Sequence, residues 1–484
     1  MVFSSLFFVL LFLPVNLLCY AFAKTIQTKN RVMLIFSLIF YAWGEPVYVL
    51  LLIAVSFVNW ALALGIGKSE DSSRRKWLLV AASAVSLFSI GVFKYAGFFL
   101  SQVKALTGFP AVVPSIALPI GISFYTFQIL SYVVDVYRRE VPYQPQFSKF
   151  LLYVSMFHQC VAGPIVRYQD VAAEITERKV SLPELGRGIT RFTVGLGKKA
   201  LLANTCSLIA DALLLSADTM AQPGAAAAMA SRPAFSLWLG MLAFMLFIYL
   251  DFSAYSDMAI GMGLMIGFHY KENFNYPYLS RSVSEFWRRW HMSLGSFFRD
   301  YVYIPLGGSR KGTGRTVFNL LVVWGLTGLW HGASWNFVLW GLYFFVFIAL
   351  EKLTLGKRLS RHPALSRVYL LAVVYFGWIL FHFTDLGLMG LLLKGMLGLN
   401  GNGFIDFEGK TTLLNYLFFL IAALVSVTPL VKRMGAVLRR AGQTSVLAGG
   451  IYNVVNVGAP PVLLILSVLA LAGNSYNPFL YFQF

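Results

Sequence analysis

The chain has 484 residues, of which 58% are hydrophobic and 12% are charged, and its mean hydropathy is +0.70. This composition excludes an ordinary soluble protein that hides its apolar residues in one core. The formal net charge of +19 comes from Lys and Arg clustered between apolar runs, where cytoplasmic retention of positive loops and anionic lipid headgroups account for it. We therefore expect a protein embedded in membrane lipids, and no nucleic-acid binding.

Apolar runs near 20 residues, the length that crosses about 30 Å of hydrocarbon, recur along the chain. They predict an all-α polytopic membrane protein with about ten or eleven transmembrane helices. The runs are 4–23, 32–66 (a pair broken at Gly44-Glu45-Pro46), 77–103, 118–136, 150–166, 189–215, 235–266, 317–353, 367–383, 413–431 and 461–472. The first run is expected to be a retained helix rather than a signal peptide, because Lys24 follows it and no basic residue precedes it.

Prolines interrupt this pattern at Pro164, Pro277 and Pro305, so helices are expected to stop there. Non-helical backbone at membrane depth is tolerated where it is buried in protein or lines a wet cavity, which favours a central chamber. We expect one integral-membrane domain over residues 1–484. The basic loops predicted on the cytoplasmic face, with the N-terminus outside, are 24–31, 68–76, 309–315 and 432–440.

Cysteine and histidine spacing predicts neither a disulfide nor a metal site. Cys19, Cys160 and Cys206 show no Cys-x-x-Cys spacing, and no histidines and carboxylates stand at metal-ligand spacing.

The first polar segment of interest is Trp330-His331-Gly332-Ala333-Ser334-Trp335-Asn336, inside the apolar run 317–353. An imidazole flanked by small residues and by indoles suits a general base in a narrow cavity. A histidine that only holds helices together by hydrogen bonds fits these residues equally well. The residues by themselves leave both interpretations open.

The second segment runs from Glu285 to Gly308 and mixes arginines with aromatic rings. Trp287, Arg288, Arg289 and Arg299 suit the binding of a phosphate-bearing donor such as a coenzyme A thioester. An amphipathic helix at the membrane surface has the same composition, and composition alone favours it.

Two further segments carry polar residues in apolar surroundings. Asp251 and Asp257 stand six residues apart, about 600° of helical rotation, so they do not share a helix face and we expect separate structural pairing with arginines. The polar residues at 118–128, followed by Asp135, are expected to serve helix packing.

Together these segments resemble the membrane-bound O-acyltransferase superfamily, and within it the alginate O-acetyltransferase branch. The resemblance extends over nearly the whole chain. The motifs that carry it are, in order, 1–5, Phe93-Lys94-Tyr95, 119–125, Ala162-Gly163-Pro164, Asp251-Phe252-Ser253, 255–259, 285–291, Trp330-His331-Gly332 and 477–484.

The resemblance implies a ring of helices around a thinned centre with a tunnel, and an enzyme of the bacterial inner membrane. It would move acetyl groups from a cytoplasmic donor, acetyl-coenzyme A, to an extracytoplasmic polysaccharide such as alginate. A periplasmic transferase is the expected partner, because the chain contains no Gly-x-Ser-x-Gly motif of its own.

The resemblance also implies roles for individual residues. His331 matches the catalytic histidine and is the expected general base, while His291, at the second polar position, or Asn336 steadies the oxyanion or orients the base. Trp330 and Asp257 join the expected substrate-binding set. The basic residues expected to hold the donor phosphates are Arg288, Arg289, Arg299, Arg310 and Lys311.

Two alternatives remain open at this point. A non-enzymatic transporter or flippase would also have many spans, but it predicts matching interrupted helices in two halves, which the sequence does not show. A member of the same superfamily with another acceptor, such as cellulose, peptidoglycan, teichoic acid, a protein or a lipid, is the second.

Overall fold

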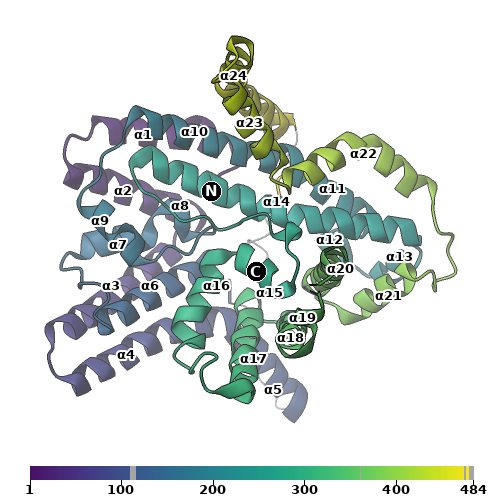
Figure 1. Cartoon of the computed structure of the whole chain (residues 1–484). Coiled ribbons are helices and arrows are strands. Elements are labelled where there is room, and N and C mark those ends of the chain that lie inside the picture. The colour runs from purple at the N-terminus through teal and green to yellow at the C-terminus, as the bar shows by residue number, and fades with distance from the viewer. Residues whose placement is uncertain (109–115, 360, 474–475, 479–484) are drawn as a thin grey trace. The chain divides into compact units, whose positions relative to one another are not determined.

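The computed structural model of the protein describes residues 1–108, 116–359, 361–473 and 476–478. Within these ranges every regular element is a helix, which confirms the predicted all-α class (Figure 1). Eight helical stretches of the described part are long and apolar enough to cross a membrane. The chain is therefore a multi-pass membrane protein. These stretches are Tyr48–Lys68, Ser72–Thr107, Leu182–Met220, Ala234–Ile266, Trp335–Leu355, Pro363–His382, Phe407–Ser426 and Val446–Gly473.

Several predicted spans form shorter helices, which explains why the number of candidate spans falls below ten. The run 118–136 becomes α6 (Ile122–Tyr137), which has 16 residues. The run 150–166 divides into α7 (Phe147–Ser155) and α8 (Phe157–Cys160), because the backbone leaves the helical conformation at Met156.

The predicted breaks are confirmed. α2 (Ile26–Gly44) ends at the predicted Gly-Glu-Pro sequence, and α3 (Tyr48–Lys68) begins shortly after it. Pro164 lies in non-helical backbone, Pro277 starts a single 3-10 turn and Pro305 lies in a turn. The apolar run 317–353 also breaks, at residues 332–334, and this break was not predicted.

Contacts within the chain define two compact units. Unit 1 comprises Met1–Phe192, Ser256–Asn273 and Ser293–Arg310, and unit 2 comprises Thr193–Tyr255, Phe274–Met292 and Lys311–Phe484. The single domain over residues 1–484 stays a prediction, as does the central tunnel.

Unit 1 is built mainly from the N-terminal helices. Its remaining elements are η1 (Phe8–Phe12), α1 (Leu13–Phe22), α4 (Ser72–Ile90), η2 (Gly91–Tyr95), α5 (Ala96–Thr107), α9 (Tyr168–Thr176), α10 (Leu182–Gly197), α16 (Met292–Phe298) and η5 (Arg299–Tyr303). The buried guanidinium of Arg178 ties several of its segments together. It donates to the Tyr20 hydroxyl at 2.9 Å and to the Asn30 side chain at 2.7 Å, and it lies 4.5 Å from the Phe268 ring centre.

Unit 2 holds the long helix α14 (Ala234–Ile266) up to Tyr255, and its helices after residue 311 are coloured green to yellow in Figure 1. The other elements of unit 2 are η3 (Lys198–Ala203), α11 (Asn204–Leu213), α12 (Ala217–Met220), α13 (Ala225–Ala230), η4 (Pro277–Leu279), α15 (Val283–Arg289), α17 (Gly312–His331), α18 (Trp335–Leu350), η6 (Glu351–Leu355), α19 (Gly356–Leu359), α20 (Pro363–His382), α21 (Leu386–Met396), α22 (Phe407–Ser426), α23 (Leu430–Ala441) and α24 (Val446–Gly473).

The predicted basic loop 432–440 is helical, because it forms most of α23. Its four cations, Lys432, Arg433, Arg439 and Arg440, occupy one arc of the helix, and apolar residues occupy the opposite arc. Both arcs are largely exposed. This short helix joins two membrane-spanning helices, a position typical of amphipathic helices at the membrane surface.

A buried ion pair in unit 2 joins η3 to α14. The Lys199 ammonium lies 2.7 Å from the Asp251 carboxylate, and the two side chains are 2% and 0% exposed. Lys199 also donates to the carbonyl oxygen of Pro478. The separate structural pairing predicted for Asp251 is thus observed, but its partner is a lysine and not the predicted arginine.

Replacing Asp251 by Asn leaves the Lys199 ammonium buried without its carboxylate, so we expect a loss of about 3–5 kcal/mol in the free energy of unfolding. The double variant Lys199→Met with Asp251→Leu removes both charges and should be markedly more stable than the single variant. Thermal unfolding in detergent compares the proteins. Unfolding of Asp251→Asn at the wild-type temperature would contradict this.

Candidate functional site

The backbones of α17 and α18 touch, and this contact positions the segment that contains Trp330 and His331. A Cβ atom added to Gly328 would lie 2.4 Å from the carbonyl oxygen of Phe337, and one added to Gly341 would lie 2.4 Å from that of Trp324. No side chain fits in either gap, so glycine is required at both positions. The chain reverses direction between the two helices at residues 332–334, next to this contact.

His331 is the last residue of α17 and is buried, with an exposed fraction of 6%. Its ring contacts aromatic side chains edge to face. The ring centres of Trp330, Trp340 and Phe381 lie 5.0, 4.9 and 5.4 Å away. The imidazole is thus held at a helix end inside an aromatic enclosure.

A small cavity of about 10 Å³ adjoins His331, which is about the space that one water molecule needs. Its wall is formed by Ile248, Phe252, Trp290, His331, Trp340, Trp378 and Phe381. Apart from the imidazole, the side chains of the lining residues are apolar or carry an indole N–H as their one polar group. The cavity therefore provides a largely apolar, low-dielectric environment for the histidine.

His291 lies close to this enclosure. Its ring centre is 4.7 Å from that of Phe252 and 5.8 Å from that of Trp330, so the Trp330 indole contacts both histidines. The backbone of His291 has φ of +44°, a left-handed conformation that is costly for a residue with a Cβ. Burial lowers the pKa of His291 to about 3, so the ring is neutral at physiological pH.

Asn336 is buried at the start of α18, but it does not line the cavity. Its side-chain amide donates to the carbonyl oxygens of Leu380 and Phe381 at 3.2 and 3.5 Å, and its oxygen accepts a hydrogen bond from the Ser334 hydroxyl. The amide thus attaches the start of α18 to the end of α20, and so holds the Phe381 ring against His331.

Trp287 packs in the aromatic cluster behind the cavity. Its ring centre lies 5.0 Å from that of Trp324 and 5.3 Å from that of Trp340, and it does not line the cavity itself. Arg289 is paired with Glu285 of its own helix at 2.6 Å. Trp287 therefore packs α15 against the aromatic cluster, and Arg289 forms an ion pair within the helix.

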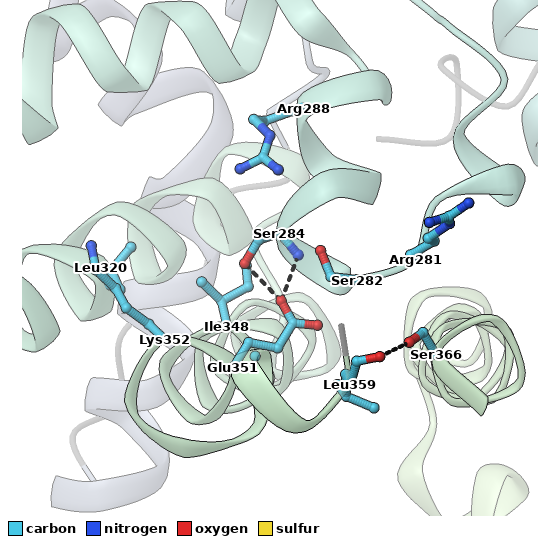
Figure 2. Close-up of a pocket in the computed structure, with 11 residues that line it drawn as sticks. Arg281, Ser282, Ser284, Arg288, Leu320, Ile348, Glu351, Lys352, Leu359 and Ser366 are labelled. Atoms are coloured by element: carbon cyan, nitrogen blue, oxygen red, sulfur yellow. Dashed lines mark hydrogen bonds between the residues drawn. The ribbon is translucent and has the colours of Figure 1, made fainter. Parts of the chain in front are cut away.

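A second, larger pocket of about 580 Å³ lies elsewhere in unit 2 and is basic. Figure 2 shows its three cations, Arg281, Arg288 and Lys352, on two chain segments around Glu351. All three cations are exposed, and within the described part of the chain neither arginine forms an ion pair with a carboxylate. The pocket therefore suits an anionic group.

Glu351 is the acid in this pocket, yet its carboxylate is occupied. It accepts hydrogen bonds from the Val283 and Ser284 backbone N–H groups at 2.5 and 2.9 Å and from the Ser284 hydroxyl at 2.7 Å. Figure 2 shows the two bonds from Ser284. These bonds satisfy the free N–H groups at the start of α15. Glu351 thereby positions the helix that carries Arg288 and leads to Trp290 and His291.

Two predicted site residues belong to unit 1 and line neither of these pockets. Asp257 is paired with Arg191 at 2.6 Å, which is the structural pairing that its position in an apolar helix predicted. Arg299 has a side chain that is 63% exposed and pairs with the neighbouring Asp300 at 2.6 Å.

Several residues that line the His331 cavity were not predicted from the sequence. Trp340, Trp378 and Phe381 stand in unbroken apolar runs, where nothing distinguishes them from residues that face lipid. Glu351 and Lys352 did carry a signal, since charges inside the run 317–353 are costly unless they are used.

No three His, Cys, Asp or Glu side chains among residues 1–108, 116–359, 361–473 and 476–478 gather in a group that could hold a metal ion. Cys19, Cys160 and Cys206 are free thiols.

Residues 33–393 match the MBOAT, membrane-bound O-acyltransferase family. The chain is 35% identical to a probable alginate O-acetylase of Pseudomonas putida, over 100% of both chains. It is 30% identical to a peptidoglycan O-acetyltransferase of Helicobacter pylori, over 83% of this chain and 80% of the relative. It is 26% identical to a teichoic acid D-alanyltransferase of Bacillus subtilis, over 55% of this chain and 67% of the relative. The resemblance predicted from the motifs is confirmed.

The glycine contact yields a matched pair of variants on α17. Gly328→Ala forces α17 and α18 apart, so we expect a loss of about 1–3 kcal/mol of stability, the range typical of overpacking. Gly325→Ala adds the same methyl group on the same helix, where nothing lies within 4 Å, and should leave stability unchanged or slightly raised. Thermal unfolding in detergent measures both, and equal unfolding temperatures for the two variants would refute the role of the contact.

Proposed function

Because the chain belongs to the membrane-bound O-acyltransferase family and is an acyltransferase, we propose that it is an O-acetyltransferase of the bacterial inner membrane. In this proposal it moves acetyl groups from a cytoplasmic donor, acetyl-coenzyme A, toward an extracytoplasmic polysaccharide such as alginate. The observation that carries the proposal is the burial of His331 at a helix end beside a small, largely apolar cavity.

His331 is the general base of the proposed reaction. It takes the proton of an acceptor hydroxyl as the hydroxyl oxygen attacks the acetyl carbonyl carbon, and it returns the proton to the departing thiolate. A water-poor enclosure strengthens each electrostatic contact made in the transition state and limits hydrolysis of the thioester. General-base assistance of this kind contributes typically about 10²–10⁴-fold in rate.

His291 acts as the second polar group of the site in this proposal. Its neutral ring carries both a donor and an acceptor nitrogen, so it can orient the acceptor hydroxyl or the carbonyl next to Trp330. Asn336 contributes by positioning, since its amide is bonded to the end of α20.

The basic pocket is the proposed place for the donor phosphates. α15 and α18 connect it to the histidine, because Arg288 and Ile348 line the pocket while Trp290 and Trp340 line the cavity. Trp340 and Ile348 are about 12 Å apart along the axis of α18, at 1.5 Å per residue. A long, linear pantetheine arm suits that separation between its phosphates and its thioester.

The volume of the His331 cavity and the similarity to known relatives guide the choice of acceptor. A cavity of about 10 Å³ is far smaller than a sugar ring, so the proposed first acceptor is a smaller group that carries a hydroxyl. A periplasmic transferase that completes the transfer is therefore the proposed partner. Alginate is the proposed polymer, because the relative from Pseudomonas putida, which is similar over the full length of both chains, is a probable alginate O-acetylase.

Reconstitution in vesicles tests the central assignment. With labelled acetyl-coenzyme A on one side of the membrane, we expect His331→Ala to reduce acetyl transfer by about 10²-fold or more. His362→Ala changes an exposed histidine and should transfer at the wild-type rate. Full transfer by a correctly inserted His331→Ala protein would exclude His331 as the base.

The donor pocket makes a separate kinetic prediction. Arg288→Ala removes a charge-assisted contact to phosphate, so the KM for acetyl-coenzyme A should rise about tenfold while kcat stays within about twofold. Arg367→Ala removes an exposed cation of α20 that does not line the pocket and serves as the control. An unchanged KM for Arg288→Ala would place the donor phosphates elsewhere and leave the role of His331 intact.

A further inference from the structure

Trp340 is fully buried in the wall of the His331 cavity, and its indole nitrogen lacks a partner. The side chain is 0% exposed, and the Nε1 atom has no hydrogen-bond partner among the residues that the structure describes. A buried indole N–H group without an acceptor costs free energy. The half-buried Trp60 and the exposed Trp238, in contrast, donate to backbone carbonyls at 2.7 and 2.9 Å.

The rings packed around Trp340 are those of phenylalanines, an indole and the imidazole of His331, and none of them accepts a hydrogen bond from the Trp340 Nε1 atom. The nearest ring centres are those of His331 at 4.9 Å, Phe344 at 5.2 Å, Trp287 at 5.3 Å and Phe381 at 5.4 Å. Trp340 lines the cavity together with the imidazole. Trp287 and Trp378 also have an Nε1 atom without a partner among the described residues. Trp287 does not line the cavity, whereas Trp378 does, and Trp340 is chosen because its ring centre lies 4.9 Å from that of His331.

The size of the cavity limits what can bind there. About 10 Å³ holds one water-sized group, which corresponds to a single oxygen atom beside the histidine. The residue with the unpartnered donor and the residue with the potential base thus line the same small cavity. A hydrogen-bond donor in this place would stabilise most strongly an oxygen that gains negative charge, because the apolar surroundings have a low dielectric constant.

We propose that the Nε1–H group of Trp340 donates a hydrogen bond to the oxygen of the acetyl group as it becomes an oxyanion. This inference rests on the proposed function. The acceptor oxygen forms a bond to the carbonyl carbon while His331 takes its proton, and the carbonyl electron pair moves onto the oxygen bonded by Trp340. That pair then re-forms the C=O bond as the C–S bond breaks. His331 gives its proton to the sulfur of the departing thiolate, which leaves as the thiol.

Trp340 therefore acts in the transition state more than in substrate binding. A donor aimed at the oxyanion raises kcat and has little effect on KM, because it strengthens only as charge develops. A purely structural tryptophan would affect protein stability and both kinetic constants together.

The sharpest test replaces Trp340 by β-(3-benzothienyl)alanine, which keeps the shape of the indole and puts sulfur in place of N–H. With the full chain in lipid vesicles, release of coenzyme A thiol from acetyl-coenzyme A is followed at varied donor concentration. We expect kcat to fall about 10²-fold, the loss typical for one oxyanion donor, with KM within about twofold and an unchanged unfolding temperature. Trp340→Phe should show the same fall in kcat.

The matched control is the same replacement at Trp324, an indole of the same aromatic cluster that does not line the cavity. It should leave kcat within about twofold of the wild type. A benzothienylalanine protein at position 340 with wild-type kcat would overturn the proposal for Trp340 while leaving the acetyltransferase function in place. Failure of the wild-type chain to cleave acetyl-coenzyme A in any vesicle orientation would instead overturn the proposed function.

Discussion

The geometry of the site depends on one steric constraint, the direct backbone contact between α17 and α18. Gly328 and Gly341 leave no room for a methyl group, so the two helices approach as closely as backbones allow. Two apolar helices in a membrane gain little from the hydrophobic effect, and close packing of this kind replaces it. His331 ends one of these helices and Trp340 belongs to the other, so the contact sets the distance between the imidazole and the indole.

A second constraint is electrostatic and acts through α15. Glu351, at the end of the hairpin formed by α17 and α18, accepts the hydrogen bonds of the first N–H groups of α15. Its carboxylate is occupied by these hydrogen bonds, so the arginines of the pocket remain available to an anionic ligand. The same helix then delivers Trp290 to the cavity wall and His291 to the side of Trp330. One carboxylate thus links the anion-binding pocket to the proposed catalytic cavity.

Charges inside the apolar helices of the protein follow a common rule, because a buried charge is costly unless it is paired. Asp251 is neutralised by Lys199 and Asp257 by Arg191, each within its own unit. The rule does not apply to Arg281 and Arg288, which are exposed and line the basic pocket. The two pairs are therefore structural, whereas the exposed arginines suit an anionic ligand.

The amino-acid sequence by itself determined the class of this protein. Apolar runs long enough to cross a bilayer, their interruption by proline and the ordered motifs around His291 and His331 are local properties of the chain, so they predicted the helices, several of their breaks and the family. Tertiary structure alone decided which side chains share a space. Trp340, Glu351 and Lys352 join the candidate sites through contacts between distant segments, whereas Asp257 and Arg299 are occupied by other partners. In an apolar helix the residues that face lipid and those that face a cavity look alike, because both are hydrophobic, and only packing separates them.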